Sequence, residues 1–387
     1  MAAELEPSPF LTLPGAVAAP DDAADRSVAA HYGNPITEQR ALHSGRAVVD
    51  LSTRGVIAVA GADRLSWLDS MTSQSLRSLR PGESAEALLL DPAGHVEHAL
   101  HLLDDGEATF VLTEGSDTDA VLAFLTSMRF MLRVEPVDRT SEFATIGAFD
   151  VPDGSARAVV QPFAVVSNGI ELAWRDPWPS VVEGGHQYAH AEHGHPGTDY
   201  HWVETLVPRE SLAGIAAEVV SAHVAVAGTL AAEALRIAAW RPRLAAEVDD
   251  RTIPHELDWL RTAVHLDKGC YRGQETVAKV HNLGHPPRRL VFLHLDGSES
   301  AQVAPGAEVL LGDVVIGRVT SFGLHHELGP IALAVIKRST DASAELVVRT
   351  DDTLVAAAQE AIVPPDAGAE ANVPRIPRLG QVTRPSR

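Results

Sequence analysis

Short apolar runs broken by turn residues dominate the first third of the chain. Apolar positions alternate on both sides of the turn at residues 53–55, which predicts two short strands. Residues 88–90 predict a further strand, which enters a tight turn at Asp91-Pro92-Ala93-Gly94 and returns along residues 96–103. This part of the chain is therefore expected to contain two strand–turn–strand units.

Helical spacing of apolar residues separates these strands. After Asp63, a residue type that favours the N-cap, Leu65, Leu68 and Met71 recur every third position. Further helices are expected near residues 120–128, 211–222, 228–240 and 274–283, the last of them ending at Gly284. Because strands and helices do not alternate regularly, the pattern predicts an α+β fold rather than a series of βαβ units.

The pattern changes after Gly284 and the pair Pro286-Pro287. Five short apolar segments follow, separated by turn residues, at 291–295, 308–311, 314–321, 331–336 and 344–349. Such closely spaced strands are typical of a small antiparallel barrel or sandwich. Both ends of the chain are rich in Ala and Pro without sustained periodicity, so residues 1–30 and 361–387 are predicted to be disordered.

Composition limits the kinds of protein that this chain can be. Its 387 residues carry 31 Lys and Arg against 52 Asp and Glu, a net charge of −21, which disfavours broad binding to nucleic acids or anionic membranes. No run reaches the roughly 18–20 apolar residues that cross a bilayer, and the N-terminal segment lacks the features of a secretory signal. The single cysteine, Cys270, excludes a disulfide framework and a zinc site built on several thiolates. The expected location is the cytoplasm.

Histidines gather in one glycine-rich segment, residues 183–201. They are His186, His190, His193, His195 and His201. The Gly and Pro content predicts an irregular loop without fixed ligand geometry, so no metal site is expected there.

The most informative segment is Lys-Gly-Cys-Tyr-Arg-Gly-Gln-Glu at residues 268–275. Its two glycines allow unusual backbone angles on either side of Cys270, and the helix predicted from Gln274 follows directly. Free N–H groups and the dipole at a helix N-terminus favour an anion. The positive charges of Lys268 and Arg272 would favour an anion there as well. From the residues alone, Cys270 is either a small buried apolar side chain or a reactive thiol.

This segment resembles the K-G-C-[YF]-x-G-Q-E signature of the YgfZ-type folate-binding proteins, a branch of the glycine-cleavage T-protein superfamily. Other segments are similar to that family as well. They are the strand pair at 48–63, the helix end at 68–74, the strand and turn at 88–96, and the Thr-Ile-Pro-His-Glu-Leu run at 252–257. The resemblance extends over residues 45–355.

The resemblance implies three domains arranged like a cloverleaf around a central channel that binds tetrahydrofolate or a derivative. The first, folate-binding domain would comprise residues 31–140 with 228–284, the second residues 141–227, and the C-terminal barrel residues 285–360. The resemblance also implies a role in the assembly or repair of iron–sulfur enzymes, with client or assembly proteins as partners, and in tRNA modification. Because four thiolate-type ligands normally hold a cluster, one cysteine could supply only a single ligand or a transient thiolate.

The resemblance also assigns roles to particular residues. Cys270 would be the functional thiol, with Lys268 as the second catalytic residue. The residues expected to bind the folate are Gln274, Glu275, Tyr271, Arg236, Trp240, Met71 and Asp91. For Arg236 the alternative is a structural ion pair, and for Trp240 a place in the core.

Two departures from relatives affect the expected chemistry. Aminomethyl transferases of the superfamily carry acidic residues after the first tight turn, whereas the aligned positions here are His98 and Ala99. Relatives usually have Glu where this chain has Ala238, so either another acid, such as Glu233 or Glu247, replaces it in binding the pterin, or pterin binding is weaker or altered. Two alternatives therefore stay open beside the iron–sulfur role: a folate-dependent one-carbon transferase of the aminomethyl type, and a non-catalytic folate-binding scaffold.

Overall fold

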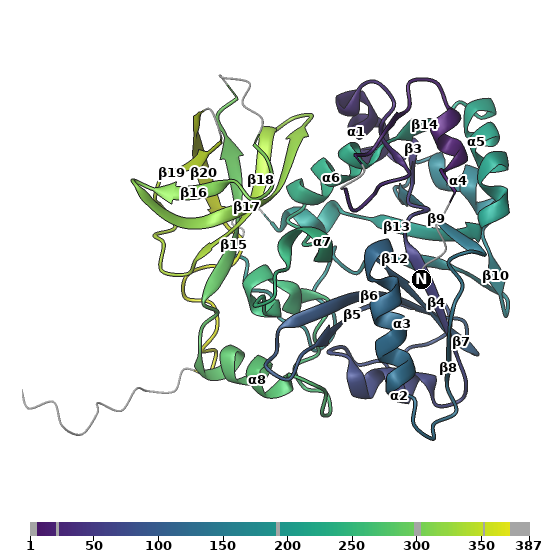
Figure 1. Ribbon diagram of the computed structural model, residues 1–387, viewed down its shortest axis with the longest axis horizontal. Helices are drawn as coiled ribbons and strands as arrows, with labels where there is room; N and C mark the ends of the chain where they lie inside the picture. The colour runs from purple at the N-terminus through teal and green to yellow at the C-terminus, as the bar shows by residue number, and fades with distance from the viewer. Residues whose placement is uncertain (1–5, 21–22, 191–193, 298–302, 351–352, 372–387) are drawn as a thin grey trace, which may run out of the picture.

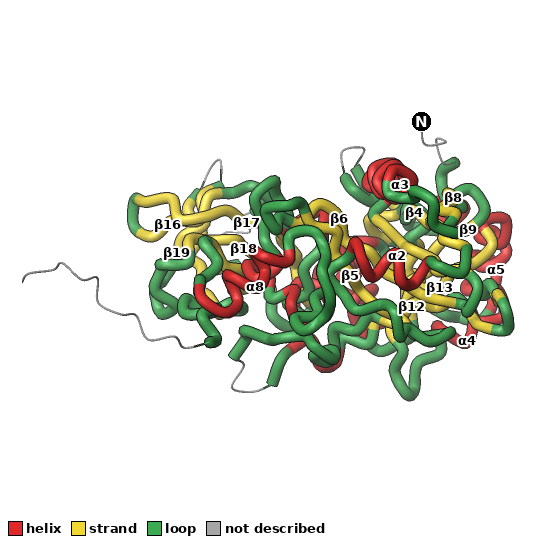
Figure 2. The backbone as a smooth tube through the Cα atoms, turned by 90° about the horizontal axis from the view of Figure 1, so that it is seen from below, coloured by secondary structure: helices red, strands yellow, loops and turns green. Residues whose placement is uncertain are grey.

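The chain folds into two sheet-containing units and a β-barrel. The computed structural model describes residues 6–20, 23–190, 194–297, 303–350 and 353–371. Figure 1 shows the two sheets next to each other, with the barrel on their flank. In Figures 1 and 2, helix α8 (Gln274–Leu283) lies between the barrel and strand β5 (Ser84–Leu90). Within the described ranges, no helix is long and apolar enough to cross a membrane.

The first sheet has five strands and is covered by helices on both faces. Its elements are β3 (Ala47–Asp50), β9 (Phe143–Phe149), β12 (Ala173–Arg175), β13 (Trp202–Pro208), β14 (Ala225–Ala227), α1 (Pro35–His43), α4 (Ala156–Val160), α5 (Leu212–Ser221) and α6 (Thr229–Ala238). The strand order is β12–β13–β9–β3–β14, antiparallel except for the parallel pair β3 and β14. Apolar residues of α4 and α5 pack on one face, where Ile146 is buried, and those of α1 and α6 pack on the other, where Val49 is buried.

The second sheet has five antiparallel strands. Its elements are β4 (Gly55–Ala60), β5, β6 (Val96–Asp104), β7 (Ala108–Thr113), β8 (Glu135–Asp138), α2 (Arg64–Met71) and α3 (Thr118–Ser127), with the strand order β5–β6–β7–β4–β8. Alternate residues of β5 face opposite sides: Leu89 packs under α2 and α3, whereas Leu88 belongs to the core shared with the first sheet. This alternation places one face of the second sheet against the first.

Strand β3 pairs with strands that lie on the other side of the domain boundary expected at residue 140. The sequence places β3 and β4 together in the first domain, but β3 pairs with β9 and β14 in the first sheet, while β4 pairs with β7 and β8 in the second. All four residues of β3 are buried, so this strand needs neighbours on both edges and cover on both faces. The turn between β3 and β4 therefore joins the two sheets.

The C-terminal part is a closed antiparallel barrel, as predicted. It consists of β15 (Arg288–Leu295), β16 (Glu308–Leu311), β17 (Val314–His325), β18 (Gly329–Lys337), β19 (Leu346–Arg349) and β20 (Leu354–Ala361), in the order β15–β18–β17–β16–β19–β20. Inward-facing Val291, Leu293 and Val348 fill its interior. The α+β prediction is confirmed as well. Minor elements are β10 (Val166–Ser167), β11 (Ile170–Glu171) and α7 (Leu244–Glu247).

Both ends of the chain differ from the predicted disorder. The segment expected as a disordered lead-in, 1–30, contains a short helix (Pro9–Thr12) and the strands β1 (Val17–Ala18) and β2 (Ala29–His31). Phe10 is fully buried against α5, and this tertiary contact is invisible in an Ala- and Pro-rich composition. In the expected tail, 361–387, Ile362 and Val363 are buried in the main core, and residues 372–387 lie outside the described part.

We expect Phe10→Ala to destabilise the protein by about 3 kcal/mol, because it removes a buried aromatic side chain and leaves a cavity. Urea unfolding measures this loss. The matched control is Val17→Ala, since Val17 is 48% exposed and its truncation should change the free energy of unfolding by less than about 0.5 kcal/mol. Equal, small effects of both substitutions would contradict the ordered N-terminal segment.

A buried segment, residues 252–264, connects the first sheet's helices to the loop that carries the cysteine. Its centre consists of two short helical turns, Pro254–Leu257 and Trp259–Arg261, joined by Asp258 in the left-handed conformation (φ 56°). Asp258 is fully buried and its Oδ1 accepts a hydrogen bond from the Tyr188 backbone N–H at 2.6 Å. Oδ2 has no partner within the described residues. Burial consequently raises the pKa of Asp258 to about 7 from an ordinary value of 3.8.

We expect Asp258 to make the protein more stable in acid. Because the folded-state pKa lies above the unfolded one, its contribution is complete below about pH 4 and is lost as the pH rises through 7, by roughly 2–4 kcal/mol. Asp258→Asn should remove this loss and be the more stable protein at pH 8, as measured by urea unfolding across pH 4–8. The exposed control Asp153→Asn should keep the wild-type slope. A D258N slope equal to that of wild type would refute the assignment.

Candidate functional site

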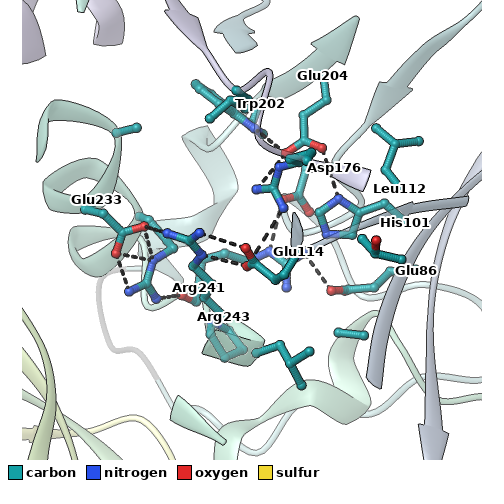
Figure 3. A pocket seen from close by; sticks show the side chains of 18 of the residues that line it. Glu86, His101, Leu112, Glu114, Asp176, Trp202, Glu204, Glu233, Arg241 and Arg243 are labelled. Atoms are coloured by element: carbon teal, nitrogen blue, oxygen red, sulfur yellow. Dashed lines mark hydrogen bonds and ion pairs between the residues drawn. The ribbon is translucent and has the colours of Figure 1, made fainter. Parts of the chain in front are cut away.

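The largest group of buried charges surrounds a hollow between the two sheets and α6, here called the central cavity (Figure 3). About 70 Å³ of space is left at its centre, while the whole hollow with its solvent-filled mouth encloses about 730 Å³. Six carboxylates and four guanidinium groups line it: Asp25, Glu86, Glu114, Asp176, Glu204 and Glu233, with Arg54, Arg236, Arg241 and Arg243. Tyr200, Trp202 and Trp259 supply aromatic wall.

Arg241 joins the two sheets across this cavity. Its Nη2 donates to Glu86 of β5 at 2.7 Å, and its Nε donates to Asp176, just after β12, at 3.0 Å. Glu86 also accepts from the Trp259 indole N–H at 2.9 Å. The remaining Arg241 nitrogen, Nη1, is buried without a hydrogen-bond partner in the part of the chain that the structure describes. Arg54, which also lines the cavity, likewise has a buried Nε without a hydrogen-bond partner in this part of the chain, so two guanidinium nitrogens remain available to a ligand.

Arg243 holds three carboxylates from distant segments together. Its guanidinium donates to Asp25 at 2.8 Å, to Glu114 at 2.6 and 2.7 Å and to Glu233 at 3.0 Å. Figure 3 shows Arg243 and Glu233 on one side of the cavity, with Glu86 and His101 on the other. Asp25 belongs to the N-terminal segment, which consequently closes part of the cavity wall.

Arginines hold most of the cavity's carboxylates in their charged form, although burial raises the pKa of Asp176. Burial works against ionisation of Glu204, but Arg54 and His101 outweigh it and lower the pKa of Glu204 to about 2. Arg236 and Arg243 likewise overcome burial and lower the pKa of Glu233 to about 2. The lining therefore keeps several ionised carboxylates beside its four arginines.

Two of the residues expected to bind folate have other partners. Arg236 lines the cavity, but its guanidinium is engaged by Glu233, Glu247 and Ser321 at 2.7–3.3 Å, the structural ion pair that was the alternative. Trp240 is buried against His195 and Phe292 rather than lining the cavity, which was its alternative place.

The two positions at which the sequence departs from relatives lie in or near this cavity. Ala99 lines it and offers no carboxylate, while His98 turns to Asp117, 2.8 Å from its Nδ1. Ala238 packs on the main core. Of the two acids expected to replace it, Glu233 lines the cavity, and Glu247 instead accepts hydrogen bonds from Arg236 and Ser321.

Sequence reasoning missed the residues that dominate the cavity. Arg241 and Arg243 follow Trp240 in the run Trp-Arg-Pro-Arg. These two closely spaced arginines were the one feature of the sequence that could have indicated the cavity. The sequence around Glu86 gave no such signal, because a carboxylate in a strand usually faces solvent. Its partners Arg241 and Thr262 are 155 and 176 residues away in the chain.

A second group of predicted residues forms the loop at 268–273, here called the thiol loop, just before α8. The ammonium of Lys268 donates to the backbone carbonyls of Asp69, Thr72 and Gln74 at 2.5, 2.8 and 2.6 Å. The Lys268 side chain is only 2% exposed, and burial lowers its pKa. All three of its donors are in use, so Lys268 positions the loop at the end of α2 and is not a free acid or base.

The other end of the thiol loop is fixed by α8 and by the turn after β5. Gln274 folds back and donates to the carbonyls of Lys268 and Gly269 at 3.1 and 3.3 Å. Gly273 adopts φ 83° with its Cα against the carbonyl of Asp91, where a Cβ would collide. Between these two anchors Cys270 is exposed to solvent.

The remaining predicted residues lie near this loop in different roles. The Asp91 carboxylate accepts from the backbone N–H of His95 at 2.8 Å and contacts the His95 ring, so it shapes the turn. Met71 is buried in the core beneath the second sheet. Tyr271 is largely buried, and Glu275 is exposed in the first turn of α8. The structure thus brings Lys268, Cys270, Gln274 and the Asp91 turn together, and leaves Met71 inside the core.

The histidine-rich segment does not form a metal centre in the described ranges, which contain no cluster of three or more His, Cys, Asp or Glu side chains suited to a metal ion. His193 lies outside the described residues. His186 packs against His281 of α8, and His195 is buried between Trp178 and Trp240.

Comparison with known proteins agrees with this architecture. Residues 28–268 match the family described as GCVT N-terminal domain, and residues 288–362 match the Glycine cleavage T-protein C-terminal barrel domain. Similar proteins include the aminomethyltransferase of Nostoc sp., 28% identical over 77% of this chain and 79% of the relative. The aminomethyltransferase of Thermus thermophilus is 27% identical over 82% of this chain and 87% of the relative.

A solved structure has the same fold. The glycine cleavage system aminomethyltransferase T from Bartonella henselae superposes with a TM-score of 0.65 at 18% identity, covering 84% of this chain and 87% of that one. Because the N-terminal family match spans more than half of the chain and the second match spans its barrel, this protein belongs to the GCVT family of glycine cleavage T-proteins.

Proposed function

We propose that this protein is a YgfZ-type member of the family, which binds a tetrahydrofolate and uses the Cys270 thiol to support the assembly or repair of iron–sulfur enzymes. The observation that carries the proposal is the thiol loop: Lys268 and Gln274 fix its backbone at both ends, while Cys270 between them is exposed. A purely structural cysteine is usually buried. An exposed thiol on a braced loop is suited to reaction with a partner protein.

The central cavity supplies the kinds of groups that a folate requires. Carboxylates can accept the pterin's ring and amino N–H groups, Trp202 and Trp259 offer aromatic surface, and the free Nη1 of Arg241 can donate to an acceptor on the ligand. Tetrahydrofolates carry one-carbon units. The 70 Å³ at the centre is too small for a pterin, so the ligand would have to use the wider hollow of about 730 Å³ and displace lining side chains.

We expect wild-type protein to bind tetrahydrofolate or its formyl derivative saturably in calorimetric titrations. Ala232→Trp should abolish binding, because Ala232 lines the cavity and the indole would occupy it. Leu230→Trp is the matched control, since Leu230 lies on the same helix, is 49% exposed and does not line the cavity. Binding that survives A232W would place the ligand elsewhere, and no binding by wild type would remove folate from the proposal.

We expect Cys270→Ala to fail to restore iron–sulfur enzyme activity in a strain that lacks this protein. The same variant should still titrate with tetrahydrofolate, because Cys270 does not line the central cavity. Lys279→Ala, an exposed change on the helix that follows the thiol loop, serves as the control and should rescue fully. Wild-type rescue by C270A would remove the thiol from the mechanism and favour the non-catalytic scaffold.

The second candidate is a folate-dependent transferase of the aminomethyl type, and the names of the similar proteins favour it. Ala99 in the cavity wall and the pairing of His98 with Asp117 count against it, because neither position presents a carboxylate to a reacting amine. Turnover of a methylamine substrate with tetrahydrofolate by the wild-type protein would establish the aminomethyl-type transferase as the function.

A further inference from the structure

His101 of β6 lies in the wall of the central cavity, two residues beyond Ala99. Alternate residues of a strand face the same side, so both side chains meet the same hollow. Figure 3 shows the His101 ring on this wall, joined to Glu204 by a dashed line. An imidazole can both accept and return a proton, which the methyl group of Ala99 cannot do. The function proposed above gives this imidazole no part.

Two contacts fix the orientation of the His101 ring. Its Nδ1 lies 3.2 Å from Oε2 of the buried Glu204, and its ring stacks on Trp174 with centroids 3.7 Å apart and planes at 4°. Trp174 is itself held, because its indole N–H donates to the Ala85 carbonyl at 2.9 Å. Because the pKa of Glu204 is lowered to about 2, its carboxylate has no proton to give, so the proton between the two groups is on Nδ1.

This tautomer, inferred from the hydrogen bond, leaves the other ring nitrogen, Nε2, with a lone pair whenever the imidazole is neutral. Nε2 forms no hydrogen bond within the described ranges. An imidazole with one nitrogen on a buried carboxylate and the other free in a cavity is arranged as a general base.

The same cavity holds two cationic donors without partners among the described residues, Nη1 of Arg241 and Nε of Arg54. Arg54 also reaches the carboxylate that orients the imidazole, with its Nη2 3.1 Å from Oε1 of Glu204. Arg241 donates to Glu86, which lies directly opposite His101 in the ladder of β5 and β6. Both arginines are thus held to carboxylates next to the imidazole. Because an unsatisfied buried donor costs free energy, the two nitrogens point to a ligand oxygen that accepts from them.

These groups distinguish between the one-carbon units that a tetrahydrofolate can carry. A formyl group presents a carbonyl oxygen that guanidinium donors can hold, whereas a methyl or methylene group presents none. Negative charge that develops on such an oxygen is stabilised by buried cationic donors. The free imidazole nitrogen can take a proton from a water molecule that attacks the carbonyl carbon. The cavity therefore combines what the hydrolysis of a formyl group requires.

We propose that the central cavity hydrolyses the formyl group of a bound formyl-tetrahydrofolate with His101 as the general base, an inference that rests on the proposed folate binding. Nε2 accepts a proton from water as the water oxygen bonds to the formyl carbon, and the carbonyl electron pair moves to the oxygen that Arg241 and Arg54 hold. The pair returns as the C–N bond breaks, and the imidazolium, stabilised by Glu204, gives the proton to the departing nitrogen. Formate and tetrahydrofolate are released, so water is the only co-reactant.

The test measures formate released from both formyl isomers of tetrahydrofolate by the full-length protein, beside calorimetric binding of the same compounds. We expect wild-type protein to release formate with saturation kinetics. His101→Gln should lower kcat at least about 100-fold, the usual contribution of general acid–base catalysis, while the formyl folate still binds. His98→Gln is the matched control on the same strand and should keep the wild-type rate, because His98 pairs with Asp117 and does not line the cavity.

Glu204→Gln provides a second measurement in case H101Q fails to fold. The neutral amide cannot stabilise the imidazolium that forms during the reaction, so kcat should fall at least about tenfold although Trp174 still stacks on the ring. Thermal unfolding of each variant shows whether it is folded.

Binding of a formyl folate by the wild-type protein without release of formate would overturn this inference and leave the proposed function intact. Formate release that folded H101Q or E204Q retains at the wild-type rate would overturn it as well, because the imidazole would then take no part. Absence of any folate binding by wild type would remove both the folate part of the proposed function and this inference.

Discussion

The geometry of the thiol loop depends on one buried ammonium group. Lys268 places its charge at the C-terminal end of α2 and donates to three backbone carbonyls there: that of Asp69 in the last turn, that of Thr72 at the C-cap and that of Gln74 just beyond the helix. A buried lysine is tolerated only when its donors are satisfied, so the loop has little freedom to move while the ammonium stays in place. The thiol is therefore exposed on a fixed backbone.

The two sheets are joined by a different kind of polar contact. Arg241 bridges Glu86 and Asp176, and Arg243 bridges Asp25, Glu114 and Glu233. Burying these charges costs free energy that their mutual attraction only partly offsets, so the network does little for net stability. It does fix which carboxylates a ligand meets, and it leaves Nη1 of Arg241 without a hydrogen-bond partner among the described residues; Nε of Arg54 has none there either. In the proposed function, the central cavity recognises the ligand and the thiol loop carries the reactive group.

Local patterns in the sequence predict local structure well here. The helix expected at 274–283 matches α8, because good helix formers end at Gly284. The five turn-separated apolar runs match five of the six barrel strands, and β20 was not predicted. Contacts between residues far apart in the chain could not be predicted from the sequence. Nothing near Lys268 indicates that its partners lie almost 200 residues earlier, and nothing in Ala- and Pro-rich residues 1–30 reveals that Phe10 completes a core. Of the site residues found by resemblance, Lys268, Cys270, Gln274 and the Asp91 turn meet in space because α2, the turn after β5 and α8 converge. Arg236, Trp240 and Met71 lie elsewhere.

Because Cys270 is the only cysteine, a nitroxide spin label attaches there alone, and its electron paramagnetic resonance line shape reports the order of the thiol loop directly. Wild type and Lys268→Met are compared, with Lys279→Met as a control that removes an exposed charge from α8. The account predicts a broadened spectrum of restricted motion for wild type and for the control, and narrow lines of rapid motion for K268M. Identical spectra for wild type and K268M would contradict the claim that the buried ammonium fixes the thiol.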